Sequence, residues 1–270
     1  REMSKSDKPF FLYVPFNAPH YPMHAPQEYM DRFADLPWDR QIMAAMISAV
    51  DDAIASIRDE LDRLRLTDNT LSVFTSDNGP SRESRNWLDG AQDPYYGGTS
   101  GGLKGHKFSL FDGGVKEPAI MSWPARIPPE QVSDQSCASM DIVPTVLEAV
   151  GVDSSQYELD GTSVLSHVVE GNDLQERPIF WEMEGQTAVR RGKWKLVLNG
   201  QLVENTEPIA DVHLSDVESD PAESTNHADS EPEITAELKA LAENWRAGIE
   251  KRWEDDYASA DYEYVAHGMV

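Results

Sequence analysis

A glycine-rich loop with three basic side chains is the segment of this sequence best equipped for chemistry. Residues 101–118, GGLKGHKFSLFDGGVKEP, bring Lys104, His106 and Lys107 together in a chain whose formal net charge is -25. Glycine tolerates positive φ, so a backbone rich in it can approach a ligand closely. A lysine ammonium is a compact charge suited to a tetrahedral oxyanion. The segment therefore predicts an anion-binding loop, and a solvated basic turn is the alternative for such a run taken alone.

Two oxygen donors follow a short apolar run further upstream. Residues 71–79, LSVFTSDNG, read as a buried parallel strand that ends in a turn at Asp77, Asn78 and Gly79. In open α/β sheets, ligands bind beyond the carboxyl ends of the strands. A carboxylate and an amide oxygen suit Ca²⁺ or Mg²⁺. Asp77 and Asn78 are therefore candidate metal ligands, with a plain turn as the alternative.

A third candidate is a histidine at the end of another apolar run. Residues 10–22, FFLYVPFNAPHYP, predict a buried strand followed by a loop in which His20 lies between Pro19 and Pro22. A histidine held at the end of a strand can donate a proton or contact an anion. A surface histidine is the alternative for a single loop residue of this kind.

Taken together, these segments resemble the type I sulfatases of the alkaline phosphatase-like superfamily. The order NAPHYP, FTSDNG and LKGHKFSLFDGG fits that family, and so do the segments that follow: VKEP, AIMSWP, SMDIVPTVLEAVGV, LDGTSV, AVRRGKWKLVL and DVHLSDVESDPAES. The resemblance extends over nearly the whole chain, roughly from Pro9 to Trp253. The first three segments are specific in combination, whereas the later ones are weaker when taken alone.

The resemblance implies roles for individual residues. Asp77 and Asn78 match the second pair of calcium ligands, with Mg²⁺ as the other possible ion. Lys107 matches the lysine that grips the sulfate group, and His20 the histidine near the leaving oxygen of the ester. Lys104 falls where the family often has an arginine, and it is interpreted as a residue that supports the site without contacting the substrate.

Two further positions are compared with the family pattern. His106 is a common companion of Lys107 to which no role is assigned. Asp112 stands where the family usually has glutamate, and this difference keeps the charge.

The nucleophile implied by the resemblance is a formylglycine made from a Cys-x-Pro/Ala-Ser-Arg signature, and that signature is not found here. The single cysteine, Cys137, lies in SCASMD without the required arginine, and it is predicted to be a small buried hydrophobic residue. The first two aspartate ligands are also not found. The chain begins at Arg1 without an initiator methionine. We therefore expect it to be the C-terminal part of a sulfatase, with the formylglycine in an N-terminal half.

The composition of the chain argues against some classes of binding partner. The strong negative charge argues against a nucleic-acid ligand. No run of residues approaches the eighteen apolar residues of a membrane helix. One cysteine excludes an internal disulfide framework. The acidic composition is compatible with a periplasmic or extracellular location, and any signal peptide would lie in the N-terminal part. The oligomeric state is not indicated.

The expected fold class is α/β: an alkaline phosphatase-like sandwich, with a mainly parallel sheet flanked by helices and a small C-terminal antiparallel sheet packed with a helix. Apolar residues spaced three and four apart predict a long helix over 39–64. This helix would join strands at 10–14 and 71–75 in a right-handed βαβ unit. Further elements are a strand over 118–123 and a short helix over 141–150, with Gly151 as its stop.

The pattern changes after about residue 170. Strands are expected at 178–181, 187–190 and 193–198, with a hairpin turn at Arg191 and Gly192. An acidic surface loop over 215–232 and a closing helix over 232–253 follow, and the tail from Glu254 is not assigned. We expect two domains, residues 1–170 from the catalytic α/β domain and residues 171–270 as a small α+β subdomain with an acidic tail.

The implied activity is hydrolysis of a sulfate ester, with a sulfated carbohydrate or another sulfate ester as the substrate. Residues 81–99 supply the aromatic rings and guanidinium groups that a sulfated sugar would need, namely Arg82, Arg85, Trp87, Tyr95 and Tyr96. An ordinary surface loop is the alternative for this stretch. Two alternatives remain for the whole chain: a phosphonate or phosphodiester hydrolase of the same superfamily, and a non-catalytic metal- or glycan-binding module.

Overall fold

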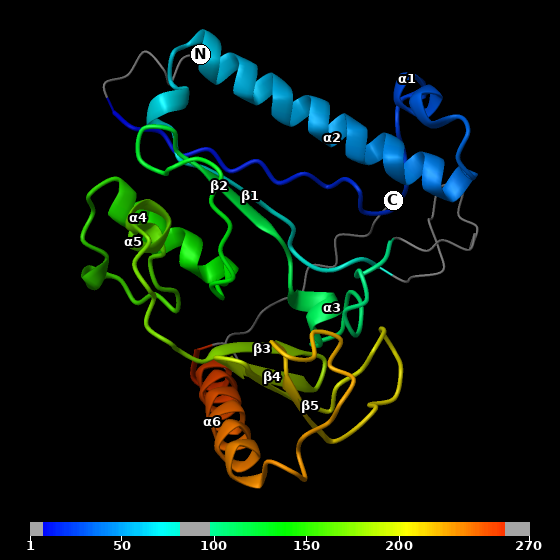
Figure 1. Cartoon of the computed structure of the whole chain (residues 1–270), viewed down its shortest axis with the longest axis vertical. Coiled ribbons are helices and arrows are strands. Elements are labelled where there is room, and N and C mark those ends of the chain that lie inside the picture. Colours follow the sequence, from blue (N-terminus) through cyan, green and yellow to red (C-terminus); the bar gives the residue numbers. More distant parts are fainter. Residues whose placement is uncertain (1–7, 82–97, 257–270) are drawn as a thin grey trace. The chain divides into compact units, whose positions relative to one another are not determined.

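The structure, a computed structural model, describes residues 8–81 and 98–256 and contains two compact units (Figure 1). The first unit comprises Arg1–Gly98 and Glu117–Gln175, and the second comprises Thr99–Lys116 and Glu176–Val270. The segment that carries Lys107 thus belongs with the C-terminal sheet. The placement of one unit relative to the other is not determined, and each is described by itself. The domain boundary expected at residue 170 stays a prediction.

The first unit is mainly helical. Its elements in chain order are α1 (Gln27–Met30), η2 (Asp31–Phe33), α2 (Trp38–Arg63), η3 (Thr67–Asn69), β1 (Ser72–Thr75), β2 (Ala119–Ser122), η4 (Ser139–Asp141), α4 (Ile142–Ala149), η5 (Ser154–Gln156) and α5 (Leu165–Glu170).

Helix α2 matches the predicted amphipathic helix to within one residue at each end. Its N-cap is Pro37, whose extended backbone precedes the first turn. Ile42 and Met46 face inward and pack against Met23, which has no exposed surface. Their spacing of four residues places them on one face of the helix. The apolar face predicted from the sequence therefore makes packing contacts in the structure.

Strands β1 and β2 pair antiparallel, with Ser72 opposite Ser122 and Thr75 opposite Ala119. The prediction that this region is a buried parallel strand is wrong for the described residues, since Phe74 is 51% exposed. Residues 10–14 form no strand, so the expected βαβ unit is absent from the described part of the chain. The physical reason is that a strand needs a hydrogen-bonded neighbour, and residues 10–16 have none among the described strands.

The short helix α4 is held at its start by a buried carboxylate. Asp141 accepts hydrogen bonds from the backbone N–H groups of Ala138 and Thr162, both at 2.8 Å. The helix ends at Ala149, and Gly151, the predicted stop, follows two residues later with φ of 74°, in the left-handed region. One side chain therefore ties the start of α4 to the turn at residues 160–163.

The second unit is a four-stranded antiparallel sheet with one long helix. Its elements are α3 (Asp112–Val115), β3 (Ile179–Met183), β4 (Gln186–Arg191), β5 (Trp194–Leu198), β6 (Val212–Asp216) and α6 (Pro232–Asp256). The strand order is β3-β4-β5-β6, so each strand pairs with its neighbour in sequence. The expected hairpin turn is confirmed, because Arg191 pairs with Trp194 across Gly192. The sequence does not predict strand β6, since its last two residues belong to the expected acidic surface loop.

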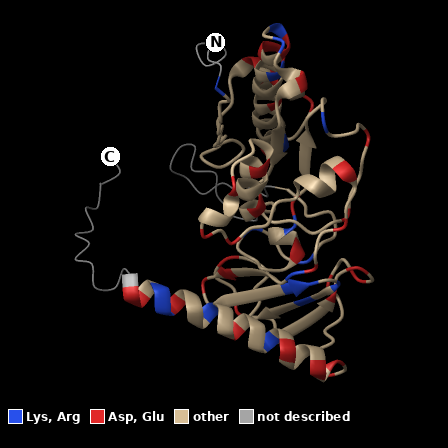
Figure 2. Ribbon diagram, turned by 90° about the vertical axis from the view of Figure 1, so that its left-hand side faces the viewer, with Lys and Arg blue, Asp and Glu red and all other residues tan. Residues whose placement is uncertain are grey.

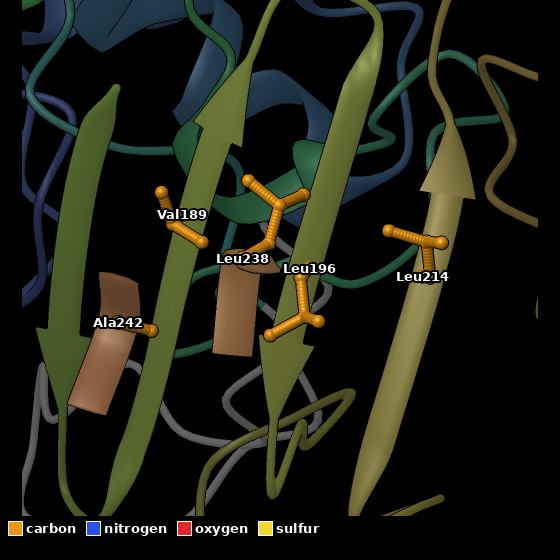
Figure 3. Close-up of a cluster of buried hydrophobic side chains, with 5 residues drawn as sticks. All are labelled: Val189, Leu196, Leu214, Leu238 and Ala242. Carbon is orange, nitrogen blue, oxygen red and sulfur yellow. The ribbon is translucent and has the colours of Figure 1, made fainter. Parts of the chain in front are cut away.

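Helix α6 covers one face of this sheet. Figure 3 shows side chains from three strands and from the helix meeting in one cluster, each of them without exposed surface: Val189, Leu196, Leu214, Leu238 and Ala242. The opposite face packs against the loop that carries Lys107, through Phe111 and Leu110 on Ala188 and Val197. Both faces of the sheet therefore make buried apolar contacts, one with α6 and the other with the loop that the sequence predicts to bind an anion.

Charged side chains of both signs lie along α6 (Figure 2). Arg246 pairs with Glu250 at 2.7 Å and Lys251 with Asp255 at 2.5 Å, one turn apart. Exposed pairs of this spacing stabilise a helix by only about 0.3–0.5 kcal/mol each. No helix among residues 8–81 and 98–256 is long and apolar enough to cross a membrane.

Candidate functional site

The predicted site residues fall in both units. His20, Asp77 and Asn78 belong to the first unit, and Lys104 and Lys107 belong to the second. The structure thus brings three of the predicted residues into one folded body and keeps the two lysines together in the other.

Asp77 and Asn78 follow directly on β1, as the sequence predicts. Asp77 is exposed and Asn78 is half-buried. The Asn78 amide nitrogen donates to the carbonyl of Gly79 at 2.9 Å, and the Ser76 hydroxyl donates to the carbonyl of Asn78 at 3.1 Å. The first of these bonds uses the amide nitrogen of Asn78, so its amide oxygen is the atom suited to a metal ion.

A third carboxylate lies near this pair and was not identified from the sequence. Strand β2 pairs with β1, and the Thr75 hydroxyl donates to the carbonyl of Pro118 at 3.2 Å, next to Glu117. Burial and the negative charge of Asp77 raise the pKa of Glu117. A cation at Asp77 would relieve this repulsion. The only signal in the sequence was the position of Glu117 before a predicted strand.

The donor chemistry at Asp77 and Asn78 fits a hard divalent cation, although the set is incomplete. Calcium takes six to eight oxygen ligands. No group of three or more histidine, cysteine, aspartate or glutamate side chains arranged to hold a metal occurs among the described residues. Asp77 and Asn78 could therefore supply only part of a calcium site.

His20 is exposed on the loop that follows residues 10–16. Its backbone N–H donates to the carbonyl of Asn17 at 2.9 Å, and its Nδ1 bonds to the carbonyl of Tyr21 at 2.7 Å. A carbonyl only accepts, so Nδ1 carries the proton in this bond. Any contact of His20 with a substrate oxygen would be made through Nε2.

Lys107 lies in a loop whose backbone is closely folded on itself. The Gly113 N–H donates to the carbonyl of Lys104 at 2.7 Å, which joins the two ends of the loop. A Cβ on Gly113 would collide with the carbonyl oxygen of Gly105, so only glycine fits there. Phe108, the residue after Lys107, has φ of 71°, which is rare for a residue with a side chain. Such backbone strain is concentrated at functional sites.

A buried glutamine from β4 fixes the loop at its strained residue. The Gln186 amide nitrogen donates to the carbonyl of Phe108 at 2.8 Å, while its oxygen accepts from the N–H of Gln201 at 2.9 Å. The Ser109 hydroxyl donates to the carbonyl of Gln201 at 2.6 Å. These bonds hold the residues just after Lys107 against the sheet. Gln186 was not identified from the sequence, because its role depends on a partner far along the chain.

Lys104 is engaged inside its own unit. Its ammonium donates to the backbone carbonyl of Glu223 at 2.5 Å and lies 5.0 Å from the centre of the Phe111 ring. Burial lowers the pKa of Lys104, whereas the nearby charge of Glu223 raises it. This environment fits the interpretation of Lys104 as a supporting residue. Lys107 is half-buried, with its ammonium 5.5 Å from the centre of the Phe108 ring.

Two other expectations concern Cys137 and the candidate substrate-selection residues. Cys137 is exposed, so the prediction that it is buried is wrong. It lies in the irregular segment before η4, where its thiol bonds to the carbonyl of Gln135 at 3.6 Å. The candidate substrate-selection residues Arg82, Arg85, Trp87, Tyr95 and Tyr96 lie outside the described residues.

Comparison with models of known sequence families identifies the family to which the chain belongs. A model of the sulfatase family matches residues 2–152, more than half of the chain. A second model, for the C-terminal region of N-sulphoglucosamine sulphohydrolase, matches residues 105–248. The chain therefore belongs to the sulfatase family, and the resemblance seen in its motifs is confirmed.

Individual relatives agree with this assignment. The chain is 29% identical to arylsulfatase A of Homo sapiens over 266 residues, covering 89% of this chain and 49% of that protein. It is 33% identical to N-acetylgalactosamine-6-sulfatase of Canis lupus familiaris over 198 residues, covering 72% of this chain and 35% of that protein. The chain thus spans half or less of the length of these two relatives.

Solved structures confirm the alkaline phosphatase-like α/β fold class. The crystal structure of Ps i-CgsB is 26% identical, with a TM-score of 0.74, and the match covers 90% of this chain and 51% of that one. A structure of the same protein in complex with k-i-k-neocarrahexaose is 26% identical with a TM-score of 0.69, at the same coverage.

Proposed function

We propose that the protein to which these residues belong hydrolyses sulfate esters, with sulfated carbohydrates as its substrates. Membership of the sulfatase family supports the reaction class. A carbohydrate substrate is supported by the relative named N-acetylgalactosamine-6-sulfatase and by the similar structure that holds k-i-k-neocarrahexaose. Residues 81–99, with their arginines and aromatic rings, are our candidate for substrate selection.

The observation that carries the proposal is the loop around Lys107. Gln186 and Ser109 fix the residues that follow this lysine, and Phe108 has a strained backbone. A charge held in a preorganised place needs no reorganisation when negative charge develops on the transferring group. Lys107 would bind an oxygen of the sulfate group, and Lys104 would support the loop through its bond to Glu223.

His20 would contact the ester oxygen of the leaving alcohol. Its Nδ1 bonds to the carbonyl of Tyr21, so the contact would be made through Nε2. Protonation of the departing alcohol then requires a second proton on the ring, that is, the imidazolium form. In the neutral form with the proton on Nδ1, Nε2 could only accept a hydrogen bond.

Asp77 and Asn78 would hold one side of a Ca²⁺ or Mg²⁺ ion, with the remaining ligands supplied from outside the described residues. The ion would neutralise charge on the sulfate group as a Lewis acid. A formylglycine nucleophile, as the family resemblance implies, would also come from outside these residues. We further propose a periplasmic or extracellular location.

The test is a comparison of two lysine variants in the full-length protein. Lys107→Ala should lower the turnover of an aryl sulfate on the order of 100-fold or more. Lys104→Ala should cost less, because the Lys104 ammonium bonds to a protein carbonyl. The measurement is kcat with saturating substrate and Ca²⁺. A larger loss in Lys104→Ala would contradict the assignment of the two lysines.

The alternative of a phosphonate or phosphodiester hydrolase calls for a second measurement. The fold alone does not separate the two activities, since a phosphonate monoester hydrolase shares it at 21% identity and a TM-score of 0.53. Turnover of matched aryl sulfate, aryl phosphate and aryl phosphonate esters by the full-length protein should favour the sulfate. Preference for a phosphorus ester would favour the alternative, and no turnover of any would favour a binding module.

A further inference from the structure

A buried group of three charged side chains lies behind the Lys107 loop, and the proposed reaction makes no direct use of it. The Lys195 ammonium lies 2.5 Å from Asp112 Oδ1 and 3.6 Å from Glu223 Oε1. The side chains of Lys195 and Glu223 have no exposed surface, and that of Asp112 is 3% exposed. The three residues come from β5, from the start of α3 and from the turn after β6. We call them the charge cluster.

Such a cluster is a poor way to stabilise a fold. Moving charges out of water is costly, and replacing a buried ion pair with apolar residues is often neutral or stabilising. Burial and the negative charge of Asp112 raise the pKa of Glu223, while Lys195 lowers it. Stabilisation of the fold therefore does not by itself explain the charge cluster. The contacts of Glu223 indicate a further role.

Glu223 holds both ends of the Lys107 loop. Its carboxylate accepts a hydrogen bond from the backbone N–H of Asp112 at 2.6 Å, at the far end of the loop. Its backbone carbonyl accepts the ammonium of Lys104 at 2.5 Å, at the near end. The bond from the Gly113 N–H to the Lys104 carbonyl joins the same two ends directly. Lys107 thus lies on a loop whose two ends converge on one residue.

Glu223 is itself fixed in place. Its φ of 49° is in the left-handed region, and its backbone N–H donates to the carbonyl of Asp220 at 2.9 Å. The Nε2 of His213 on β6 donates to its carbonyl at 3.1 Å. The Lys195 ammonium on β5 lies 3.6 Å from the carboxylate oxygen Oε1 of Glu223. Glu223 therefore connects the sheet to the loop with little freedom of its own.

We propose that Glu223 is a positioning residue for the sulfate-binding loop, acting through Asp112 and Lys104 to place Lys107. This inference rests on the proposed role of Lys107 in sulfate ester hydrolysis. Lys195 supplies a positive charge beside the Glu223 carboxylate, which accepts the hydrogen bond from the Asp112 N–H. Misplacing a catalytic group by about 1 Å can cost on the order of 100-fold in rate. The gain in rate from a well-fixed loop would therefore offset the loss of stability from burying charge.

Three variants of the full-length protein test this. Glu223→Ala removes both carboxylate oxygens. Glu223→Gln keeps an acceptor for the Asp112 N–H and leaves Lys195 and Asp112 as a balanced pair, so it also covers the case in which the alanine variant does not fold. Glu237→Gln is the matched control, because Glu237 bonds to Arg191 at 2.7 Å on the exposed side of the same unit, away from the loop.

The first readout is hydrogen exchange of peptides that cover residues 104–114. We expect faster exchange in Glu223→Ala, an intermediate rate in Glu223→Gln and the wild-type rate in Glu237→Gln. Wild-type protection of these peptides in folded Glu223→Ala, or in Glu223→Gln if only that variant folds, would overturn the proposal. This readout does not depend on catalysis.

The second readout is a double-variant cycle with Lys107→Ala. Glu223→Ala alone should lower kcat on the order of 10- to 100-fold and weaken inhibition by inorganic sulfate, at a temperature where the protein is folded. In the Lys107→Ala background, the same change should have little further effect. A purely structural role would lower the melting temperature without this coupling, so independent effects of the two substitutions would overturn the proposal.

The two readouts separate failure of this inference from failure of the proposed function. If the wild-type protein turns over no sulfate ester, the proposed function fails; if it does and Lys107→Ala leaves turnover unchanged, the assigned role of Lys107 fails. In either case hydrogen exchange still decides whether Glu223 anchors the loop. If Lys107→Ala is inactive and the exchange of the loop does not respond to Glu223, only the positioning role fails.

Discussion

At the scale of single residues, the proposed metal site depends on a carboxylate that we expect to contribute little to folding. Asp77 is exposed at the end of β1, so its removal leaves no buried group without a partner. We expect Asp77→Ala in the full-length protein to reduce both Ca²⁺ content and activity while the unfolding midpoint stays near that of the wild type. Elemental analysis after dialysis against dilute Ca²⁺ measures the first effect, and thermal unfolding checks the last.

Asp68→Ala provides a control for this variant. Asp68 is also exposed, and its backbone carbonyl, which accepts the N–H of Ala125, would remain. It should keep wild-type metal content and activity. Unchanged metal content in Asp77→Ala would refute the assignment of Asp77 as a ligand.

A second residue-scale prediction concerns pH. Burial, together with the positive charge of Lys104, lowers the pKa of His213 from 6.5 to about 4. Between these pH values the unfolded chain binds a proton that the folded protein does not, so stability falls as pH drops from about 6.5 towards 4. This group should account for a loss of about 1 to 2 kcal/mol in the free energy of unfolding between pH 7 and pH 5.

The variant His213→Gln isolates this contribution. Urea unfolding of the full-length protein at pH 7 and pH 5 should show a smaller loss in the variant than in the wild type. His24→Gln, which alters an exposed histidine, should retain the wild-type loss. An equal pH dependence in His213→Gln and the wild type would show that His213 is not the group responsible, and would direct attention to Glu223 and Asp220, which lie beside it.

The sequence indicates candidate site residues at chain turns more readily than buried polar residues that hold such turns in place. Asp77, Asn78 and Lys107 stand beside glycines and strand ends, which are local signals. Lys195 and Gln186 are buried polar residues within strands, and nothing local distinguishes them from exposed polar residues. Their partners lie 83 and 78 residues away in sequence, so only the folded structure reveals them.

At the scale of elements, the contact between α6 and the sheet should dominate the stability of the second unit. Leu238 is fully buried among Val189, Leu196 and Leu214 (Figure 3). Leu238→Ala should destabilise the protein by about 2 to 5 kcal/mol, through lost burial and the cavity that remains. Leu241→Ala, on the partly buried edge of the same cluster, should cost less. Chemical denaturation of the two variants measures the difference, and equal losses would contradict this account of the core.

Elements with a strong period were predictable, and those that depend on distant pairing were not. The helices α2 and α6 follow the spacing of apolar residues in the sequence. The sequence does not predict strand β6 because Ser215 and Asp216 begin the expected acidic surface loop, although both are buried, as is His213 before them. They are buried because β6 pairs with β5 and contacts Glu223 and Asn226 through its polar groups.

At the scale of the whole molecule, the first unit exposes several large apolar side chains. Phe11 is 69% exposed, Tyr13 is 75% exposed and Ile120 on β2 is 63% exposed. Exposed apolar segments beside unpaired strands favour association with other chains. We therefore predict that residues 1–270 expressed alone are poorly soluble and lack sulfatase activity.

The same surface gives this prediction a complementation test. Supplying the N-terminal half of the full-length protein in trans should restore part of the aryl sulfatase activity, since it would cover the exposed strands and provide the nucleophile. Light scattering and an aryl sulfate assay with a metal-free control measure both effects. Calcium-dependent turnover by residues 1–270 alone would show that this chain carries a nucleophile of its own.

The second unit is assembled from two stretches of chain, and this limits how the protein can be shortened. Residues 99–116 supply Leu110 and Phe111, which are almost fully buried against Ala188 and Val197. A fragment that starts at residue 176, where the second stretch begins, would contain all four strands and α6, but it would leave one face of its sheet without a covering layer. A self-contained C-terminal fragment would instead need the earlier stretch joined to it by a new linker, for example between residues 116 and 176.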